Sequence, residues 1–592
     1  MVFESPASVP KLPIDPPDSI PIAEFMRNEA YGRYPIAQSR NPYTCGLTGT
    51  SYSWPEFFER SERIARALGA HKKLGWQPNA ATPWDKVACL FSLNTIDYIT
   101  VAYAVHRFSG IVTPANAAYS APELQQQLTS ANVKVLFTCL PLLEVALPAA
   151  KAAGIPDDQI FLLPVPNMDG SFPKNNTPFL TVEDLVKAGA NAPTLPPLQW
   201  SQGQGARQPA FLCYSSGTSG LPKAVMISHR NVISNALQHA TYESKARAKR
   251  GVKTQVVGAP LPFSHIFGLV AVCHSNPWRG DGVVVVPKFE FDMFLKVIQK
   301  HKANHLILVP PILVQMLNRL DVLKKYDLSS VNHIMSGAAP LAEEVVRGLQ
   351  AAYPKWNIGQ GWGMTETSTV VSWQDQDDVF LRGSGSLLPG ARLKLMAPAP
   401  EDGSASVGRE ITEYDTPGEI FVQAPSVVLG YLHNERASDE TFVHHDDGRW
   451  IRTGDEGLIT KSPSGNEHLV VVDRIKELIK VKGFQVAPAE LEAHILAHPQ
   501  VSDVAVIQVP DERAGEVPKA FVVRAPSRKP EDDAELSKIV IQHVQDTMTH
   551  YKWLKGGVDV IEAIPKSPSG KILRRLLRDQ EKEKRRKAGS KL

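Results

Sequence analysis

A loop of glycine and hydroxyl residues between two apolar segments constrains this chain more than any other feature. Residues 214–225 read Tyr-Ser-Ser-Gly-Thr-Ser-Gly-Leu-Pro-Lys-Ala-Val. Glycines let the backbone turn its N–H groups inward, hydroxyls add further donors, and a lysine adds a point charge. The loop therefore predicts a site that wraps a phosphate chain. The candidate contacts are Ser215, Ser216, Gly217, Thr218, Ser219, Gly220 and Lys223.

The flanking segments indicate how this loop is held. Residues 209–214 and 224–228 are short and apolar, as strands are. We predict a loop between two strands, because the Lys-Ser/Thr pair that follows the last glycine of a P-loop is missing after Gly220. A plain Ser/Gly linker is the alternative interpretation of this string taken alone.

Length, charge and cysteine content narrow the class of protein. A chain of 592 residues is too long for one core and predicts about two to four domains or subdomains. Its 64 basic and 61 acidic residues leave a net charge of +3, which predicts neither nucleic-acid nor membrane-surface binding. Five scattered cysteines favour a reducing compartment over a disulfide framework or a zinc site. No apolar run approaches the ~18 residues of a membrane span, so we expect no integral membrane segment.

The order of sequence patterns predicts the domain organisation. Residues 1–22 are rich in proline and predict an extended arm on the surface. Strand-like and helix-like segments alternate over 86–153 and again over 256–370, which predicts two αβ units with parallel sheets. Short strands with Gly and Pro turns begin near residue 385 and predict a small β subdomain that includes 425–431.

A second change of composition marks the C-terminal part. Residues 473–485 are dense in charge, and a new series of strands and helices begins after them. The last residues, 581–592, are too polar to form a core and predict a disordered tail. The predicted parts are an arm at 1–22, a large domain at 23–472, a hinge at 473–476, an α+β domain at 477–576 and a charged tail at 577–592.

Further motifs follow the phosphate loop. They are Ser-Gly-Ala-Ala-Pro-Leu at 336–341, Gln-Gly-Trp-Gly-Met-Thr-Glu-Thr at 360–367, Thr-Gly-Asp at 453–455, the charged segment 473–485, and Pro-Lys-Ser-Pro-Ser-Gly-Lys at 565–571. In this order they resemble the adenylate-forming superfamily, which includes acyl-CoA synthetases, 4-coumarate–CoA ligases, luciferases and peptide-synthetase adenylation domains. The resemblance covers residues 30–575. The chain departs from it at Ala224, where relatives usually carry Gly, and at Trp362, where most carry Tyr.

The resemblance implies a fold and a set of small molecules. The fold is α/β, with a large N-terminal domain of two αβ sheet subdomains plus a small β subdomain, followed by a small mobile α+β C-terminal domain. The small molecules are ATP, Mg²⁺ and CoA as cosubstrate.

The resemblance also assigns the nucleotide contacts. The small residues of 336–341 would let a purine lie against the backbone, and the ring of Trp362 would stack on it. Asp455 would accept the ribose hydroxyls, with help from Arg474, and Glu366 would bind Mg²⁺. The implied ATP or AMP contacts are the phosphate-loop residues given above together with Ala338, Gln360, Gly361, Trp362, Thr365, Asp455, Arg474, Lys476 and Lys571.

Catalysis and the other substrates are assigned in the same way. Lys571 would hold the acyl carboxylate against the α-phosphate, and Lys476 would be the pivot of the hinge. His265 would lie beside the reacting carboxylate, although a lone histidine in an apolar segment is more often a core residue. The implied catalytic residues are Lys571, His265 and Lys480; the acyl contacts are His265, Ala338, Gly361 and Met364; the CoA contacts are Lys288, Lys482 and Gly483.

The implied function is an ATP-dependent carboxylic acid–CoA ligase, either 4-coumarate–CoA ligase-like or a medium-chain acyl-CoA synthetase, that acts on a small carboxylic acid. The alternatives are a luciferase-like adenylating oxygenase, a stand-alone enzyme that loads a carrier protein, and a non-catalytic binding protein. A carrier domain is not expected after Lys571, and a non-catalytic relative is expected to lack Lys571 or Glu366. Ser590, Lys591 and Leu592 form a peroxisomal address, so we expect a peroxisomal location and the peroxisomal import receptor as a partner.

Overall fold

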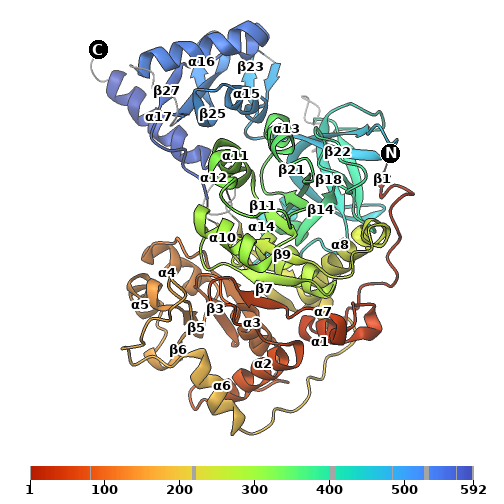
Figure 1. The fold of residues 1–592 in the computed structure, drawn as a ribbon, viewed down its shortest axis with the longest axis vertical. Coiled ribbons are helices and arrows are strands. Elements are labelled where there is room, and N and C mark those ends of the chain that lie inside the picture. The colour runs from red at the N-terminus through yellow and green to blue at the C-terminus, as the bar shows by residue number, and fades with distance from the viewer. Residues whose placement is uncertain are drawn as a thin grey trace.

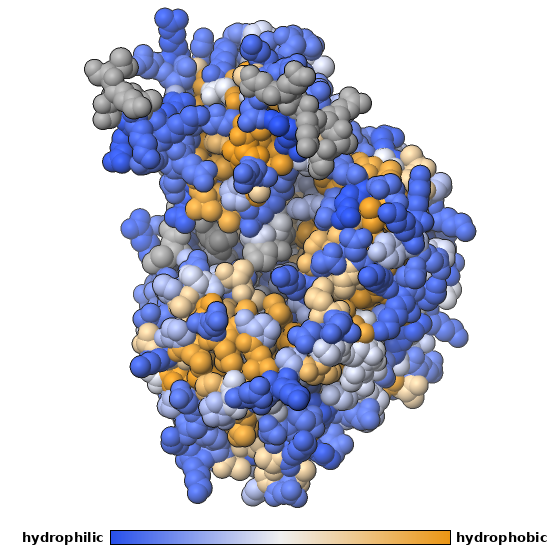
Figure 2. Space-filling view, turned by 60° about the vertical axis from the view of Figure 1, so that its left-hand side comes forward, coloured by the Kyte–Doolittle hydropathy of each residue, from blue (hydrophilic) through white to orange (hydrophobic). Residues whose placement is uncertain are grey.

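The computed structural model describes residues 2–80, 82–215, 222–398, 408–482, 484–525, 533–567 and 570–589. Within these residues, three sheets lie in the large domain and a fourth lies in the C-terminal domain (Figure 1). The space-filling view shows the smaller lobe above the larger one (Figure 2). The predicted α/β fold class, with a large N-terminal and a small C-terminal domain, is confirmed.

The first αβ sheet carries the phosphate loop at one end. Its strand order is β19-β8-β7-β4-β3-β5-β6. The parallel part follows the predicted alternation of strand and helix, because each buried apolar strand is followed by a helix that covers the sheet. The strands are β3 (Val87–Leu90), β4 (Ile111–Pro114), β5 (Val135–Thr138), β6 (Ile160–Leu162), β7 (Pro209–Ser215), β8 (Lys223–Ser228) and β19 (Gly430–Tyr431); the helices are α1 (Ile22–Arg27), α2 (Trp54–Gly69), α3 (Tyr98–His106), α4 (Ala121–Ser130), α5 (Leu143–Ala152), α6 (Val182–Ala190) and α7 (Gln204–Arg207).

The second αβ sheet has the order β15-β14-β13-β12-β11-β9-β10-β2 and is parallel from β13 to β2. A π-helix, η5, begins two residues after His265. The strands are β2 (Tyr43–Cys45), β9 (Val256–Ala259), β10 (Gly282–Val285), β11 (His305–Leu308), β12 (His333–Ser336), β13 (Asn357–Met364), β14 (Thr369–Trp373) and β15 (Ser386–Leu387). The helices are α8 (His229–Lys249), η5 (Phe267–Ser275), α9 (Asn276–Trp278), α10 (Phe291–His301), α11 (Pro310–Asn318), α12 (Leu320–Leu323), α13 (Glu343–Ala352) and the 3₁₀ turn η6 (Thr365–Thr367).

The β subdomain is an antiparallel sheet that the N-terminal arm joins. Phe3 is 2% exposed and pairs with Leu393, so the start of the arm is built into the fold. The strands are β1 (Phe3–Glu4), β16 (Arg392–Met396), β17 (Glu410–Ile411), β18 (Gly418–Gln423), β20 (Phe442–His445), β21 (Gly448–Lys461) and β22 (Glu467–Arg474), with α14 (Glu435–Thr441) beside them. The prediction that 425–431 belongs to this subdomain is wrong for Gly430 and Tyr431, which pair with β8 instead.

The C-terminal domain is α+β, as predicted, but its last residues differ from the expectation. The sequence predicts disorder from residue 581, whereas α17 (Arg574–Gly589) continues through it. Leu577 is fully buried, and the Lys519 ammonium lies 2.6 Å from Glu581, so packing and ion pairs hold this charged helix. The other elements are β23 (Ile479–Val481), β24 (Phe484–Val486), β25 (Val501–Asp511), β26 (Gly515–Arg524), β27 (Val558–Val560), α15 (Pro488–Leu496) and α16 (Asp533–Thr547).

Candidate active site

The phosphate loop joins two antiparallel strands, as the sequence predicts. Ser215 ends β7, Lys223 begins β8, and these two residues are register partners. Ser216, Gly217, Thr218, Ser219 and Gly220 lie outside the described residues. The structure therefore places the two ends of the loop directly across from each other.

Glu366 lies beside the base of this loop. It is 6% exposed, and its Oε1 accepts hydrogen bonds of 3.0 Å from the Ser215 hydroxyl and 3.0 Å from the Tyr431 hydroxyl. The Lys223 ammonium lies 4.8 Å from the centre of the Tyr431 ring. Sequence reasoning did not select Tyr431, because it reaches Glu366 only through the pairing of β19 with β8.

Asp455 is held by two of its predicted neighbours. The Trp362 indole N–H donates to Oδ2 at 3.0 Å, and Arg474 Nε lies 3.4 Å from Oδ1. Asp455 and Arg474 are opposite each other on β21 and β22. Burial raises the pKa of Asp455, and the charge of Arg474 opposes this rise. Tryptophan in place of tyrosine thus keeps a polar contact, through its N–H.

Unusual backbone angles occur in and directly after the glycine-rich segments 336–341 and 360–367. Ala338 has φ +71°, Ser368 has φ +54° and Thr369 has φ +98°, which are rare for residues with a Cβ and most of all for a β-branched one. Such outliers concentrate at functional sites. Gln360 joins the two segments, since its Oε1 accepts from Leu341 N at 3.2 Å and its Nε2 donates to Gly383 O at 2.9 Å.

Lys571 of the C-terminal domain points at this site. Its loop turns at Gly570, whose φ is +82°. A Cβ at Gly570 would lie only 3.0 Å from Pro311 of α11, so glycine lets the loop approach this helix closely. Burial lowers the pKa of Lys571 to about 8; the charge of Arg474 adds to this, and Asp455 and Glu366 act against it. The ammonium is therefore mostly charged at neutral pH and lies within electrostatic range of both carboxylates.

His265 faces the same space from the large domain. Its Nδ1 accepts a 3.3 Å hydrogen bond from Phe267 N, at the start of η5. Burial and the charge of Lys571 lower its pKa to about 4, so the imidazole is neutral at physiological pH. Single-turn π-helical segments occur often at functional sites. Met364 ends β13 and Thr365 begins η6.

The remaining predicted residues are four lysines on the surface and one glycine. Lys288, Lys476, Lys480 and Lys482 are exposed, and Gly483 lies outside the described residues. The pKa of Glu440 on α14 is lowered mainly by Arg436, with smaller effects from Lys223 and Lys476, which places both lysines near that helix. The backbone N–H of Lys480 donates to Glu516, and that of Lys482 to Ala514, within the C-terminal domain.

The metal prediction rests on one carboxylate. Among the described residues, no group of three or more His, Cys, Asp or Glu side chains could hold a metal ion. Mg²⁺ commonly takes one or two carboxylates and completes its shell with substrate phosphates and water. Glu366 fits that role, because its Oε1 accepts both protein hydrogen bonds and its Oε2 has none among the described residues.

Similarity to known proteins agrees with this geometry. Residues 36–432 match the AMP-binding enzyme family, and residues 490–571 match the AMP-binding enzyme C-terminal domain. The acyl-CoA ligase AKT1 of Alternaria alternata is 38% identical over 98% of this chain and 97% of that protein. The acyl-CoA ligase easD of Emericella nidulans is 37% identical over 98% of this chain and 100% of its own length. The fold resembles ATP-bound MatB from Rhodopseudomonas palustris, with a TM-score of 0.74 and 24% identity over 95% of this chain and 99% of that one.

Proposed function

Because the chain belongs to the AMP-binding enzyme family, we propose that it is an ATP-dependent carboxylic acid–CoA ligase that makes an acyl-adenylate and then an acyl-CoA thioester. The observation that carries this proposal is the position of Lys571, which reaches from the C-terminal domain toward Asp455, Glu366 and His265. Relatives named acyl-CoA ligases align over nearly the whole chain, which supports CoA as the acceptor.

In the first half-reaction, a carboxylate oxygen attacks the α-phosphorus of ATP, and the bond from that phosphorus to pyrophosphate breaks. Lys571 would hold the attacking carboxylate and counter its charge, and neutral His265 would border it without repelling Lys571. Asp455 would orient the ribose, and Lys223 would face the phosphates. Glu366 would hold Mg²⁺, which when bound supplies positive charge to the phosphate oxygens.

The products test this reaction directly. With ATP, Mg²⁺, CoA and an accepted acid, we expect AMP and pyrophosphate in equal amounts, because the attack is at the α-phosphorus. Nucleotide chromatography with a coupled pyrophosphate assay measures both. Formation of ADP and phosphate would contradict the proposal, since the attack would then be at the γ-phosphorus.

The pKa of Lys571 predicts a pH dependence of adenylation. The charged lysine is lost as the pH rises through about 8, so kcat/KM for the first half-reaction should fall above that pH. Lys571→Arg should shift this fall in kcat/KM to higher pH, because the guanidinium group stays charged. The measurement is the rate of pyrophosphate release that depends on the carboxylic acid substrate, taken at a series of pH values. If the fall in kcat/KM occurred at the same pH in the arginine variant, Lys571 would not be the group that causes it.

In the second half-reaction, the CoA thiol sulfur attacks the acyl carbon, the bond from that carbon to the AMP oxygen breaks, and the thiol proton passes to solvent. Lys480 and Lys482 are exposed. They would reach the thiol side once the C-terminal domain turns about the 473–476 hinge. Exposed Lys288 would then meet CoA phosphates.

The identity of the acid and of the molecule that accepts the acyl group distinguishes this function from its alternatives. An aryl-propenoate and a medium-chain fatty acid are both compatible with the small residues Ala338 and Gly361. A luciferase-like oxygenase would emit light with luciferin, and a carrier-loading enzyme would transfer the acyl group to phosphopantetheine on a protein. Thioester formation on free CoA without light separates the three functions.

We also propose import into peroxisomes through Ser590, Lys591 and Leu592, which lie outside the described residues. Deleting this tripeptide is expected to move a fluorescent fusion from peroxisomes to the cytosol and to leave the kinetics of the purified enzyme unchanged. A punctate distribution that survives the deletion would show that another signal directs the protein. None of the described helices is long and apolar enough to cross a membrane.

A further inference from the structure

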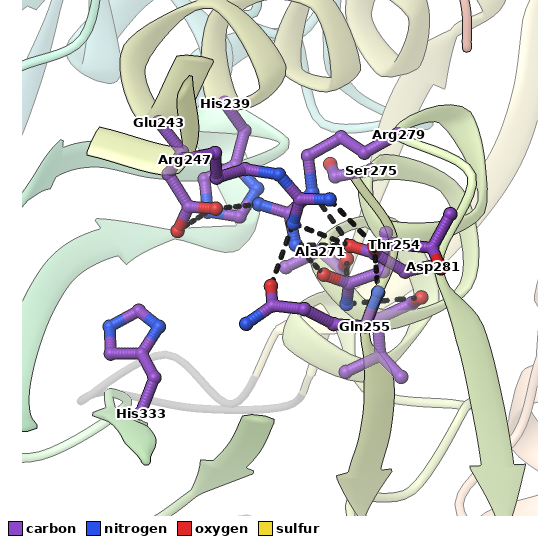
Figure 3. Close-up of polar contacts among 12 residues, drawn as sticks. His239, Glu243, Arg247, Thr254, Gln255, Ala271, Ser275, Arg279, Asp281 and His333 are labelled. Atoms are coloured by element: carbon purple, nitrogen blue, oxygen red, sulfur yellow. Dashed lines mark hydrogen bonds and ion pairs between the residues drawn. The ribbon is translucent and has the colours of Figure 1, made fainter. Parts of the chain in front are cut away.

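A buried cluster of charged side chains joins α8, which carries Glu243 and Arg247, to Arg279 and Asp281 (Figure 3). Arg247 and Arg279 lie 2.8 and 3.0 Å from the two carboxylate oxygens of Asp281, and Arg279 also pairs with Glu243. These four residues are at most 6% exposed. Replacing a buried ion cluster by apolar residues is often neutral or stabilising, so stability alone does not explain it.

The cluster ends on one aromatic ring, that of Trp373. Glu243 Oε1 accepts a 2.9 Å hydrogen bond from the Trp373 indole N–H. Tyr242 donates its hydroxyl to the Trp373 carbonyl, and the His239 ring meets the indole edge-on with 4.8 Å between centroids. Because positions 239, 242 and 243 share one face of α8, that face holds the indole in one orientation.

The indole also borders the predicted acyl segments. Trp373 is the register partner of Gly361, where an added Cβ would overlap the indole ring. The Phe267 ring lies 6.4 Å from the Trp373 ring between centroids, and 3.0 Å from the place of a Cβ at Gly337. The two glycines therefore leave room that Phe267 and Trp373 fill, and these rings set the volume beside positions 337 and 361.

We propose that Trp373 is a specificity-determining residue that limits the length of the acyl chain, and that Glu243 is a positioning residue that holds its indole. The inference rests on the proposed ligase function. An acid whose chain reaches the ring gains apolar contact, whereas a longer chain must displace the ring and break its hydrogen bond to a buried carboxylate. The favoured substrates are carboxylic acids with a short to medium apolar chain.

The test uses acid-dependent pyrophosphate release with a series of straight-chain acids. The length ratio is kcat/KM for the acid that is one methylene longer divided by kcat/KM for the best acid of the native enzyme. Trp373→Phe should raise this ratio on the order of tenfold, the effect of one methylene in an apolar pocket. A matched control is Trp450→Phe, which removes another buried indole whose N–H donates to a carboxylate, that of Asp447 at 2.9 Å, and should leave the ratio unchanged.

Glu243 is tested through the same ratio, which does not depend on the fraction of enzyme that folds. Glu243→Leu removes the acceptor of the Trp373 hydrogen bond, whereas Arg279 keeps its ion pair with Asp281. This variant should raise the length ratio. Glu243→Gln keeps a carbonyl acceptor and should stay near the native ratio. In the Trp373→Phe background, Glu243→Leu should add nothing further.

Two results would overturn the inference: an unchanged length ratio in Trp373→Phe or Glu243→Leu, or an equal effect of Glu243→Leu in both backgrounds. Pyrophosphate release with aryl-propenoates but with none of the straight-chain acids would also overturn the inference. Absence of release by the native enzyme with aryl-propenoates and straight-chain acids alike would instead reject the ligase function itself.

Discussion

Lys571→Ala is expected to slow acyl-adenylate formation by roughly 100-fold or more. The substitution removes the positive charge that lies within range of Asp455, Glu366 and His265, and positioning together with charge stabilisation commonly contributes at least this much. The measurement is single-turnover formation of the adenylate from ATP and acid. Given pre-formed acyl-adenylate and CoA, the same variant should make thioester near the native rate, because the hinge would have turned Lys571 away.

Two variants serve as controls for this result. Lys566 lies on the same loop, but its ammonium pairs with Asp503 at 2.6 Å within the C-terminal domain, so Lys566→Ala should leave adenylation nearly unchanged. Lys480→Ala should show the opposite pattern, with adenylate accumulating and thioester formation slow. Equal slowing of both half-reactions in Lys571→Ala would contradict a mechanism with two domain arrangements.

Glu366→Gln is expected to slow the first half-reaction by about 10²- to 10³-fold, the usual range for removing one group that stabilises developing charge. Glutamine keeps a carbonyl acceptor for Ser215 and Tyr431, whose hydroxyls both donate to Oε1 at 3.0 Å, so the change is mainly a loss of charge. If this carboxylate binds Mg²⁺, part of the loss should be recovered at high Mg²⁺. Rates across a magnesium titration measure both effects.

Tyr431→Phe is the matched control for Glu366. It removes one hydrogen bond to the same oxygen and leaves the carboxylate charge in place. We expect a loss of about tenfold, in line with ~1.5 kcal/mol, the lower end of the range for one hydrogen bond to a charged group. A Glu366→Gln variant that matched Tyr431→Phe and ignored Mg²⁺ would show that Glu366 is structural.

Local patterns predicted much of the fold. The apolar segments on both sides of residues 216–221 became β7 and β8. Helix α2 is likewise encoded locally, because Ser53 and Glu56 form a capping box and the apolar face of α2 is buried. These features depend on residues that are close together in the chain, so the sequence alone is sufficient to predict them. The tail shows the limit: α17 is polar, and its order depends on Lys519 and other partners far away in sequence.

The residues of the candidate site likewise fall into those that the sequence predicted and those that only the structure revealed. The sequence indicated four candidate site residues, because each lies in a short motif whose residue types suit phosphate, ribose or metal binding: Glu366, Asp455, Arg474 and Lys571. Tyr431 was not, because no spacing in the sequence indicates that β19 pairs with β8. The same holds for the hydrogen bond from Trp362 to Asp455, which needs β13 and β21 to be brought together.

The sequence by itself determined the family and the two strands on either side of residues 216–221, and it supplied the candidate residues of the nucleotide site, since residue type and local spacing encode these features. Only the tertiary structure decided that Lys571 faces the large domain, that Tyr431 supports Glu366, and that Glu243 of α8 holds Trp373 against Gly361. The physical reason is that pKa shifts, buried ion pairs and pocket volume arise from groups far apart in the chain, and packing alone sets their distances.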